Sequence, residues 1–418
     1  MTARSWRWLL LGLVLITASG GLVAWHLWPD PHWTAAHQAL ARHDYEAAYA
    51  HLQQCLQHRP RDPQVLFLAA RTARRARRYE QAEKHLRAYQ RLQGETNAIR
   101  LERALMRAQR GDSQVESYLQ ARVAAGDPDT LLILEVLIQF YLDNYQLFKA
   151  RDCLDLYLER RPNDVSALLG RGYIWERLFH YPEAVRDYRR AVQIEPDNEH
   201  ARLRLAETLA ITGPPEEAAE QFEWLRQRHP DSLAARLGLA RCWRQMGWTE
   251  ETQQLLDGLI HEHPQHAGIL TERGRLALEM GDLQRAADWL RQAVALAPTD
   301  REALYNLSRC LQQMGRDAEA REYHQRFQRA DADLKRLGQL TKNVLRHPHD
   351  PALRCEVAAI FLRNGEEAEG VRWLHLALRD APDYGPAHQA LADYYQRTGK
   401  PELAAHHRQL AEARHRQP

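Results

Sequence analysis

Histidine is the residue type in this chain with the widest chemical range, because imidazole both binds divalent metals and titrates near neutral pH. The sequence holds 21 histidines, and three groups of them are closely spaced, one of which is the pair His406-His407 near the C-terminus. His261, His263 and His266 fall in one short stretch around a proline, and His347 and His349 flank another. A metal site needs three or four ligands that converge from a rigid frame, whereas loops around prolines commonly carry solvated polar residues. We therefore predict that these histidines bind no metal.

Covalent or cofactor-dependent catalysis has no recognisable signature in the sequence. No glycine-rich phosphate loop, G-x-S-x-G turn or H-E-x-x-H zinc helix is present. The cysteines are far apart and make no C-x-x-C pair, which argues against a zinc site and a disulfide framework. They are Cys55, Cys153, Cys242, Cys310 and Cys355. We expect them to be small buried apolar residues, and we predict no enzyme, no catalytic residue and no cofactor.

Arginine offers a recognition chemistry that the sequence repeats. Arg241, Arg275 and Arg309 follow one another at intervals of 34 residues, and Arg244 lies one helical turn after the first. A guanidinium group binds a carboxylate through two parallel hydrogen bonds, so such a series could hold an acidic peptide or an acidic C-terminus. The alternative is neutralisation within the protein by nearby glutamates, namely Glu207, Glu279 and Glu302.

The densest basic stretch is Arg71 to Arg78, which reads RTARRARR. Contact with anionic lipid headgroups is one interpretation of it. The other is a solvated helix face whose charge is balanced by Glu80 and Glu83. We favour the second interpretation, because the N-terminal residues predict an exported domain, which meets the less anionic leaflet of a membrane.

These side chains require a regular framework, and prolines mark its period. Of eight positions spaced 34 residues apart, seven are proline and the eighth is Gly94, another helix breaker. The prolines are Pro60, Pro128, Pro162, Pro196, Pro230, Pro264 and Pro298. After a gap of 50 residues, the spacing of 34 resumes between Pro348 and Pro382. A repeat of this length indicates a solenoid of stacked units rather than separate globular domains.

Other positions recur with the same period and describe the inside of one unit. If the proline is position 32, then within residues 29–320 position 20 is alanine in seven units, position 15 is glycine in five, and position 8 is often small. Examples are Ala184, Ala286, Gly172, Gly274 and Gly281. Small residues let two antiparallel helices approach, glycine turns the chain between them, and proline ends the second helix. The larger apolar residues have helical spacing, so we predict essentially no sheet.

This pattern resembles the tetratricopeptide-repeat (TPR) family, and the resemblance extends over residues 34–415. It implies an all-α solenoid of about ten to eleven helix-turn-helix units, wound into a right-handed superhelix, in which each unit packs on its neighbours. It also implies that positions 2, 5, 9, 12 and 13 line a concave groove. The candidate groove residues are then Leu169, Tyr173, Leu203, Leu237, Arg241, Arg244, Arg275, Tyr305 and Arg309.

Three segments define the expected organisation of the array. Residues 29–320 carry the main repeats, with an irregular unit near residues 97–130, where Glu116 stands at a position for a small residue. Residues 321–347 contain an apolar seam and no proline, so we expect an elongated second helix and a short extra helix. Residues 348–418 carry two more units and a polar last helix, which is typical of a cap.

The N-terminal residues predict a connection to a membrane. Trp8 to Trp28 carry no charged side chain, and 21 helical residues span a hydrocarbon core of about 30 Å. Because Arg4 and Arg7 precede this stretch, the positive-inside rule places residues 1–7 in the cytoplasm and the repeats on the other side. The alternative is a signal peptide cleaved near Ala18, which gives a secreted or periplasmic protein.

Together these features predict a scaffold that binds a protein or peptide at a membrane, for the assembly or trafficking of an envelope complex. The alternative is an accessory module of a polysaccharide-export or glycosylation system that binds a glycan or a partner enzyme. The net charge is only +2, which gives no support for binding to nucleic acid.

Overall fold

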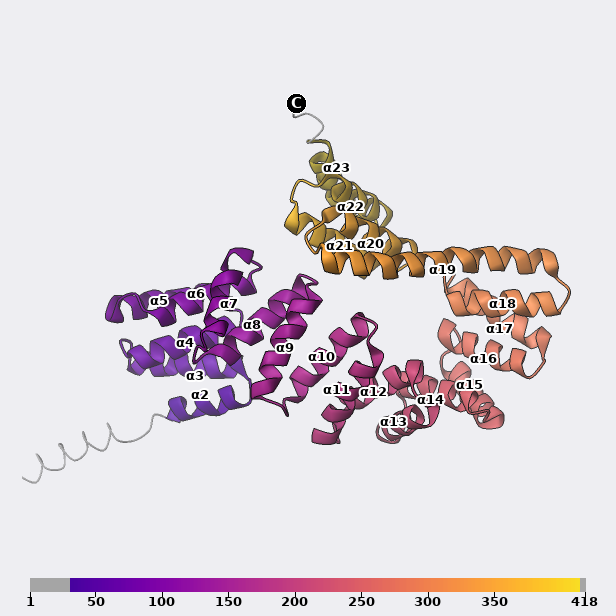
Figure 1. The fold of residues 1–418 in the computed structure, drawn as a ribbon, viewed down its shortest axis with the longest axis horizontal. Coiled ribbons are helices and arrows are strands. Elements are labelled where there is room, and N and C mark those ends of the chain that lie inside the picture. The colour runs from indigo at the N-terminus through magenta and orange to yellow at the C-terminus, as the bar shows by residue number, and fades with distance from the viewer. Residues whose placement is uncertain (1–30, 414–418) are drawn as a thin grey trace, which may run out of the picture. The chain divides into compact units, whose positions relative to one another are not determined.

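The computed structural model of the chain describes residues 31–413, and these residues are arranged as successive helices (Figure 1). There are 22 α-helices and one short 3-10 helix in this range, and no strand occurs in it. The all-α prediction is therefore confirmed. In chain order the α-helices form eleven consecutive pairs, which agrees with the expected number of units.

The chain divides into two compact units between Phe140 and Tyr141, and α8 (Thr130–Asp143) contains this boundary. The first unit otherwise contains α2 (Pro31–Ala41), α3 (Tyr45–His58), α4 (Pro63–Arg75), α5 (Tyr79–Gln93), α6 (Asn97–Gln109), the 3-10 helix η1 (Ser113–Val115) and α7 (Glu116–Ala124). The pair formed by α6 and α7 is irregular, because its second helix is short and η1 precedes it.

The second unit contains the remaining helices. They are α9 (Leu147–Arg160), α10 (Val165–Arg177), α11 (Tyr181–Ile194), α12 (Glu199–Thr212), α13 (Pro215–Arg228), α14 (Leu233–Gln245), α15 (Thr249–Glu262), α16 (Ala267–Glu279), α17 (Leu283–Leu296), α18 (Arg301–Gln313), α19 (Asp317–Arg346), α20 (Pro351–Arg363), α21 (Glu367–Asp380), α22 (Gly385–Arg397) and α23 (Pro401–Ala413).

Local sequence explains where the first helix of most pairs begins. Two residues after the periodic proline stands a side chain that accepts a hydrogen bond from the first-turn amides, which have no partner within the helix. These N-cap residues are Asp62, Asp164, Asn198, Ser232, His266, Asp300 and Asp350. Asp164, for example, accepts from the amide of Ala167 at 2.9 Å. The proline therefore ends one helix and the cap starts the next.

The small residues at positions 8 and 20 lie where two helices of a pair approach. A Cβ atom added to Gly172 would lie 2.5 Å from Cε1 of Tyr188, and one added to Gly274 would lie 2.6 Å from Cγ of Leu290. Ala184 and Ala286 at position 20 are completely buried. A larger side chain at these positions would force the helices apart, because the interior is already closely packed.

The turn between the helices uses the left-handed region at position 15, as expected. Glycine occupies it at Gly247, Gly281 and Gly315, with φ of 80°, 81° and 73°. In four pairs another residue takes the same conformation. His43, Arg77, Tyr145 and Phe179 have φ of 58°, 57°, 58° and 62°. An L-residue in this region is strained by about 1–2 kcal/mol. Contacts of these side chains must offset that strain, or the turn lowers the stability of the fold.

The insertion that follows Pro298 is simpler than the sequence suggested. We expected an elongated second helix and a short extra helix, but α19 is one continuous helix of 30 residues. Leu340 and Val344 near its C-terminal end are completely buried, so the late part of the insertion has a packed face of its own.

Unit 2 also contains contacts that the repeat pattern did not predict. Tyr145 packs edge-on against Trp373, with 4.5 Å between the ring centroids. Nε2 of Gln146 lies 3.1 Å from Nε2 of His349, although 203 positions separate the two residues. We name these four residues the closing contact. These contacts are additional to the packing of each pair on its neighbours, because the residues preceding α9 also meet α21 and the loop before α20.

No helix within residues 31–413 combines the length and the apolar composition that a membrane span requires. The predicted membrane segment at residues 8–28 lies outside the described residues, and so does the alternative cleavage site.

Candidate binding groove

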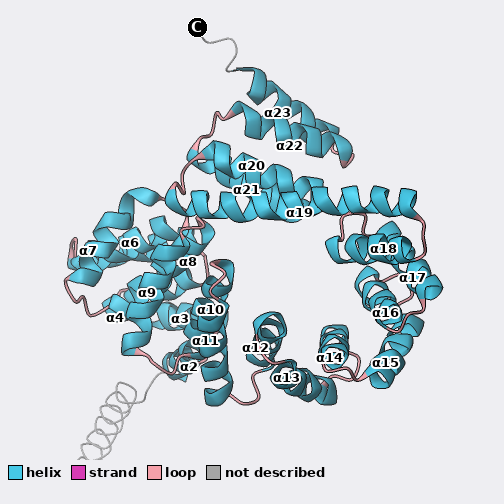
Figure 2. Cartoon of the chain, turned by 45° about the vertical axis from the view of Figure 1, so that its right-hand side comes forward, coloured by secondary structure: helices cyan, strands magenta, loops and turns pink. Residues whose placement is uncertain are grey.

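The inner side of unit 2 has an open cavity of about 1280 Å³. Helices α10, α12, α14 and α16 supply one part of its lining, and α19, α20 and α21 supply another. Figure 2 shows helices α12 to α19 following one another around a common centre. The first helices of successive pairs therefore contribute side chains to one continuous surface.

Four large apolar side chains in this lining are exposed. Tyr173, Phe179, Ile211 and Leu334 have 43%, 54%, 65% and 49% of their surface accessible. Exposed apolar groups that gather on a concave surface are typical of a binding site, because a partner removes them from water. We name these four residues the apolar patch.

Phe179 combines exposure with backbone strain. It occupies the left-handed turn between α10 and α11, where the other repeats often have glycine. Its ring packs on the edge of Tyr181 at a centroid distance of 6.4 Å, and the side chain is more than half exposed. Burial therefore does not compensate the strain, which points to a role outside the folded core.

Beside the apolar patch, charged groups neutralise one another. Arg204 of α12 pairs with Glu176 of α10, and its Nη1 donates to Oε2 of Glu207 at 2.8 Å. Burial lowers the pKa of Arg204, but the adjacent Tyr188 and Glu176 raise it and the net direction is upward. Arg204 is therefore a cation whose charge is already balanced.

Arg241 and Arg244 of α14 share a buried carboxylate. Nε of Arg241 donates to Oε1 of Glu272 at 2.7 Å, and Nε of Arg244 donates to Oε2 at 3.3 Å. Nη1 of Arg244 also donates to Oε1 of Glu279 at 2.8 Å. Glu279 is one of the neutralising glutamates that the sequence suggested, while Glu272 is the main partner and was not predicted.

The other two arginines of the series lie in a neighbouring cavity of about 400 Å³. Arg275 and Arg309 line it together with Tyr305, and the guanidinium of Arg309 lies 5.7 Å from the centroid of the Tyr305 ring. Nε of Arg275 is 3.7 Å from Oε1 of Glu279, which is beyond hydrogen-bonding distance. The charge of Arg275 is therefore only weakly compensated.

The structure places most of the nine candidate groove residues in these linings. Tyr173, Leu237, Arg241, Arg244 and Arg275 line the large cavity. Leu169 and Leu203 instead pack against the hydrophobic core formed around Tyr188, Phe222 and Leu239. Their half-buried side chains therefore contribute to the packing of α10 and α12 on that core.

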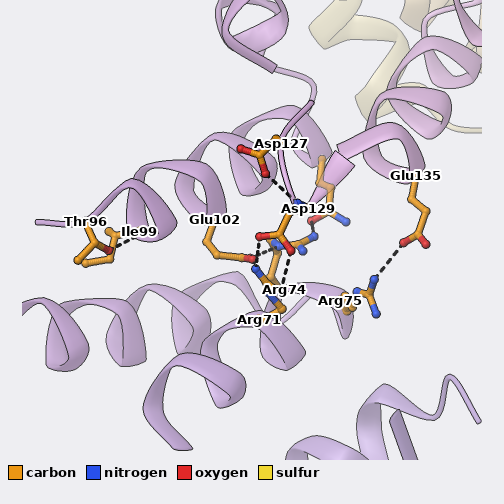
Figure 3. A network of polar contacts seen from close by, with 10 residues as sticks. Arg71, Arg74, Arg75, Thr96, Ile99, Glu102, Asp127, Asp129 and Glu135 are labelled. Carbon is orange, nitrogen blue, oxygen red and sulfur yellow. Dashed lines mark hydrogen bonds and ion pairs between the residues drawn. The ribbon is translucent and has the colours of Figure 1, made fainter. Parts of the chain in front are cut away.

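The basic stretch of α4 is an internal electrostatic cluster, so both interpretations from the sequence miss its main partners. Figure 3 shows Arg71, Arg74 and Arg75 directed at carboxylates of later helices and loops. Nε of Arg71 and Nε of Arg74 donate to Glu102 at 2.7 and 2.6 Å, and Arg75 donates to Glu135 at 3.0 Å. The predicted neighbours, Glu80 and Glu83, do not provide these contacts.

Two of the grouped histidines make structural contacts, and four of the five cysteines are buried as expected, whereas Cys355 is only half-buried. His266 caps α16 by accepting from the amide of Ile269 at 3.3 Å, and His349 belongs to the closing contact. Burial raises the pKa of Cys242 to about 11 and that of Cys355 to about 12, so both thiols are protonated near neutral pH. No metal-binding cluster of three His, Cys, Asp or Glu side chains occurs within the described range.

Several groove residues were missed at the sequence level, although signals for them exist. Ile211 stands at position 13, which the TPR resemblance already assigned to the groove. Phe179 stands at a position that other units fill with glycine. Glu272 follows Arg244 by 28 residues, as Glu102 follows Arg74. Leu334 had no such signal, because it lies in the insertion outside the 34-residue register.

A stack of helical hairpins with an exposed inner surface defines an α-solenoid of the class that binds other proteins. Three tetratricopeptide-repeat models match the chain. The first matches residues 39–108, 212–271 and 277–343, the second matches residues 244–301, and the third matches residues 165–198. These matches together cover more than half of the sequence, and the chain belongs to the tetratricopeptide-repeat family.

Several solved structures are similar to the chain. PilW, a widely conserved type IV pilus biogenesis factor, is 20% identical, with 47% of this chain and 92% of that one covered and a TM-score of 0.40. A thermophilic TPR protein of Thermus thermophilus is 25% identical over 48% and 100%, with a TM-score of 0.34. MamA from Desulfovibrio magneticus is 14% identical over 40% and 95%, with a TM-score of 0.34. A search of curated proteins found no match.

Proposed function

We propose that the chain is a non-enzymatic scaffold that binds a polypeptide segment in the large cavity of unit 2. The observation that carries this proposal is the apolar patch, which exposes Phe179, Ile211 and Leu334 on one concave surface. Aliphatic and aromatic side chains of a partner would remove these groups from water. The weakly compensated Arg275 beside them favours a partner segment that is also acidic.

We further propose that residues 8–28 anchor the scaffold in a membrane, with the repeats on the extracytoplasmic side, for the assembly or trafficking of an envelope complex. The uncharged stretch between Trp8 and Trp28 supports the anchor, and Arg4 and Arg7 support the orientation. Deleting residues 1–28 should release the protein from carbonate-washed membranes. Release of the full chain by the same wash would favour cleavage of a signal peptide.

Photo-crosslinking in cells tests the binding proposal. A benzophenone amino acid replaces Phe179 in one variant and Phe148 in a matched control, since Phe148 is also exposed, at 43%, but does not line the cavity. We expect one discrete protein adduct at position 179 and none at position 148, with the adduct identified by mass spectrometry. Equal adducts at both positions, or a glycan adduct in place of a protein, would contradict a polypeptide groove.

A further inference from the structure

The same three-residue arrangement occurs once in each unit. In unit 1, Nε of Arg71 and Nε of Arg74 donate to the two oxygens of Glu102 at 2.7 and 2.6 Å. In unit 2, Nε of Arg241 and Nε of Arg244 donate to the two oxygens of Glu272 at 2.7 and 3.3 Å. The sequence separations are identical, at 31 and 28 residues. Both carboxylates are buried, so each fixes the orientation of two guanidinium planes.

The two arrangements differ in the partners of the Nη1 and Nη2 atoms of Arg71 and Arg241. In unit 1, Nη1 and Nη2 of Arg71 hold the two oxygens of Asp129 at 3.2 and 2.9 Å, as Figure 3 shows. In unit 2, no carboxylate within residues 31–413 pairs with Nη1 or Nη2 of Arg241. The side chain of Arg241 is 44% exposed, against 25% for Arg71, and it lines the large cavity.

Counting charges gives the same asymmetry. In unit 1, Arg71, Arg74 and Arg75 pair with three carboxylates, Glu102, Asp129 and Glu135. In unit 2, the carboxylates of the described residues that pair with Arg241, Arg244 and Arg275 are two, Glu272 and Glu279. One more carboxylate would complete the hydrogen bonds of Arg241.

We propose that the Nη edge of Arg241 binds the side-chain carboxylate of an aspartate or glutamate within the polypeptide that occupies the groove. Asp129 shows within this chain how the partner's carboxylate sits, with both oxygens on the two Nη atoms. The inference rests on the proposed function, and it names Arg241 as the residue that selects an acidic side chain in the bound polypeptide. Glu272 holds the guanidinium in place before binding, so little side-chain freedom is lost when the carboxylate arrives.

The test uses random peptides displayed with their C-termini fused to the phage coat, so that no terminal carboxylate is offered. They are selected on the full chain, and the best binder is then synthesised with capped ends. We expect a shared aspartate or glutamate. Its replacement by the corresponding amide should weaken binding by about 10- to 100-fold, in line with the loss of charge-assisted hydrogen bonds.

Arg241→Gln should cause a similar loss for the acidic peptide and little further loss for its amide counterpart. Arg236→Gln is the matched control, because Arg236 lies on the same helix and pairs with Glu262; it should leave the affinity unchanged. Arg241→Lys keeps a cation but cannot reach Glu272 and the ligand with the same geometry, so an intermediate loss is expected. It also provides a second variant if Arg241→Gln does not fold, as judged by circular dichroism.

Two results would contradict this inference but would leave the proposed function intact. One is a set of groove-binding peptides that lack acidic residues, and the other is an acid-to-amide loss that is equal in the native protein and in Arg241→Gln. Failure of every selected peptide to compete with the crosslink at position 179 is a different result. It would count against the groove as a polypeptide site.

Discussion

Glu102 is the carboxylate that pairs with both Arg71 and Arg74 of α4. Its side chain and that of Arg74 are each 1% exposed, and it also accepts from Arg71. Removing one partner of a buried ion pair leaves the other charge uncompensated, at a cost of about 3–5 kcal/mol. We therefore expect Glu102→Gln to lower the free energy of unfolding of unit 1 by about 3 kcal/mol in urea denaturation.

The matched control for Glu102→Gln is Arg75→Gln on the same helix, which removes the more exposed pair with Glu135. Pairs of that kind contribute about 0–1 kcal/mol. Equal effects of the two substitutions would show that Glu102 is not the centre of the cluster.

Phe179 should show opposite effects on stability and on binding. Glycine at this position relieves the left-handed strain at φ 62°, so Phe179→Gly should raise the free energy of unfolding by about 1 kcal/mol. The same change removes part of the apolar patch and should weaken a groove-binding peptide. Thermal unfolding and a peptide titration measure the two effects on one sample.

The control for Phe179→Gly is Tyr145→Gly. Tyr145 has a similar φ of 58° but is 3% exposed and packs on Trp373, so this variant should lose stability. A stabilised Phe179→Gly protein with unchanged peptide affinity would remove Phe179 from the site.

At the scale of the element, α19 offers a clean test of helix propensity. Gly338 lies in the interior of this helix, and a Cβ atom added to it meets nothing within 4 Å. Gly338→Ala should therefore increase the free energy of unfolding of unit 2 by about 1 kcal/mol. Gly370→Ala on α21 is the contrasting variant, because its Cβ would lie 2.6 Å from Cγ of Leu362. It should be destabilising by about 1–3 kcal/mol, and a gain in stability from both would contradict the packing described here.

The elements that depend on local chemistry were predictable from the sequence. Proline with a cap two residues later marks the helix boundaries, and small residues such as Gly172 mark where helices approach. Contacts between neighbouring helix pairs were not predictable from one period. Glu102 and Glu272 lie in the helix pair that follows the arginines they bind, and detecting them requires comparison of two offsets, 28 and 31. The continuity of α19 was not predictable, because the apolar seam of the insertion is compatible with one helix or with two.

At the scale of the whole chain, the closing contact changes how far along the solenoid the effect of a substitution should extend. In an open array, a substitution in α21 alters only α21 and the adjacent pairs. In unit 2, Trp373 of α21 packs on Tyr145, and Nη2 of Arg379 donates to the carbonyl oxygen of Asp143 at 3.1 Å, 236 positions away. Partial desolvation lowers the pKa of Arg379, and the carbonyl oxygen accepts one hydrogen bond from this cation, which also remains exposed to solvent.

Trp373→Ala should therefore increase amide hydrogen exchange at residues 144–148 as well as around α21, because loss of the indole frees the residues that precede α9. The control is Leu391→Ala on α22, which removes a completely buried side chain from the neighbouring helix pair but no part of the closing contact. It should increase exchange in α21 to α23 and leave residues 144–148 unchanged. If Trp373→Ala also leaves residues 144–148 unchanged, unit 2 is an open array in solution. In that case α19, α20 and α21 do not form one wall of the groove, and a partner reaches the apolar patch without any opening of the closing contact.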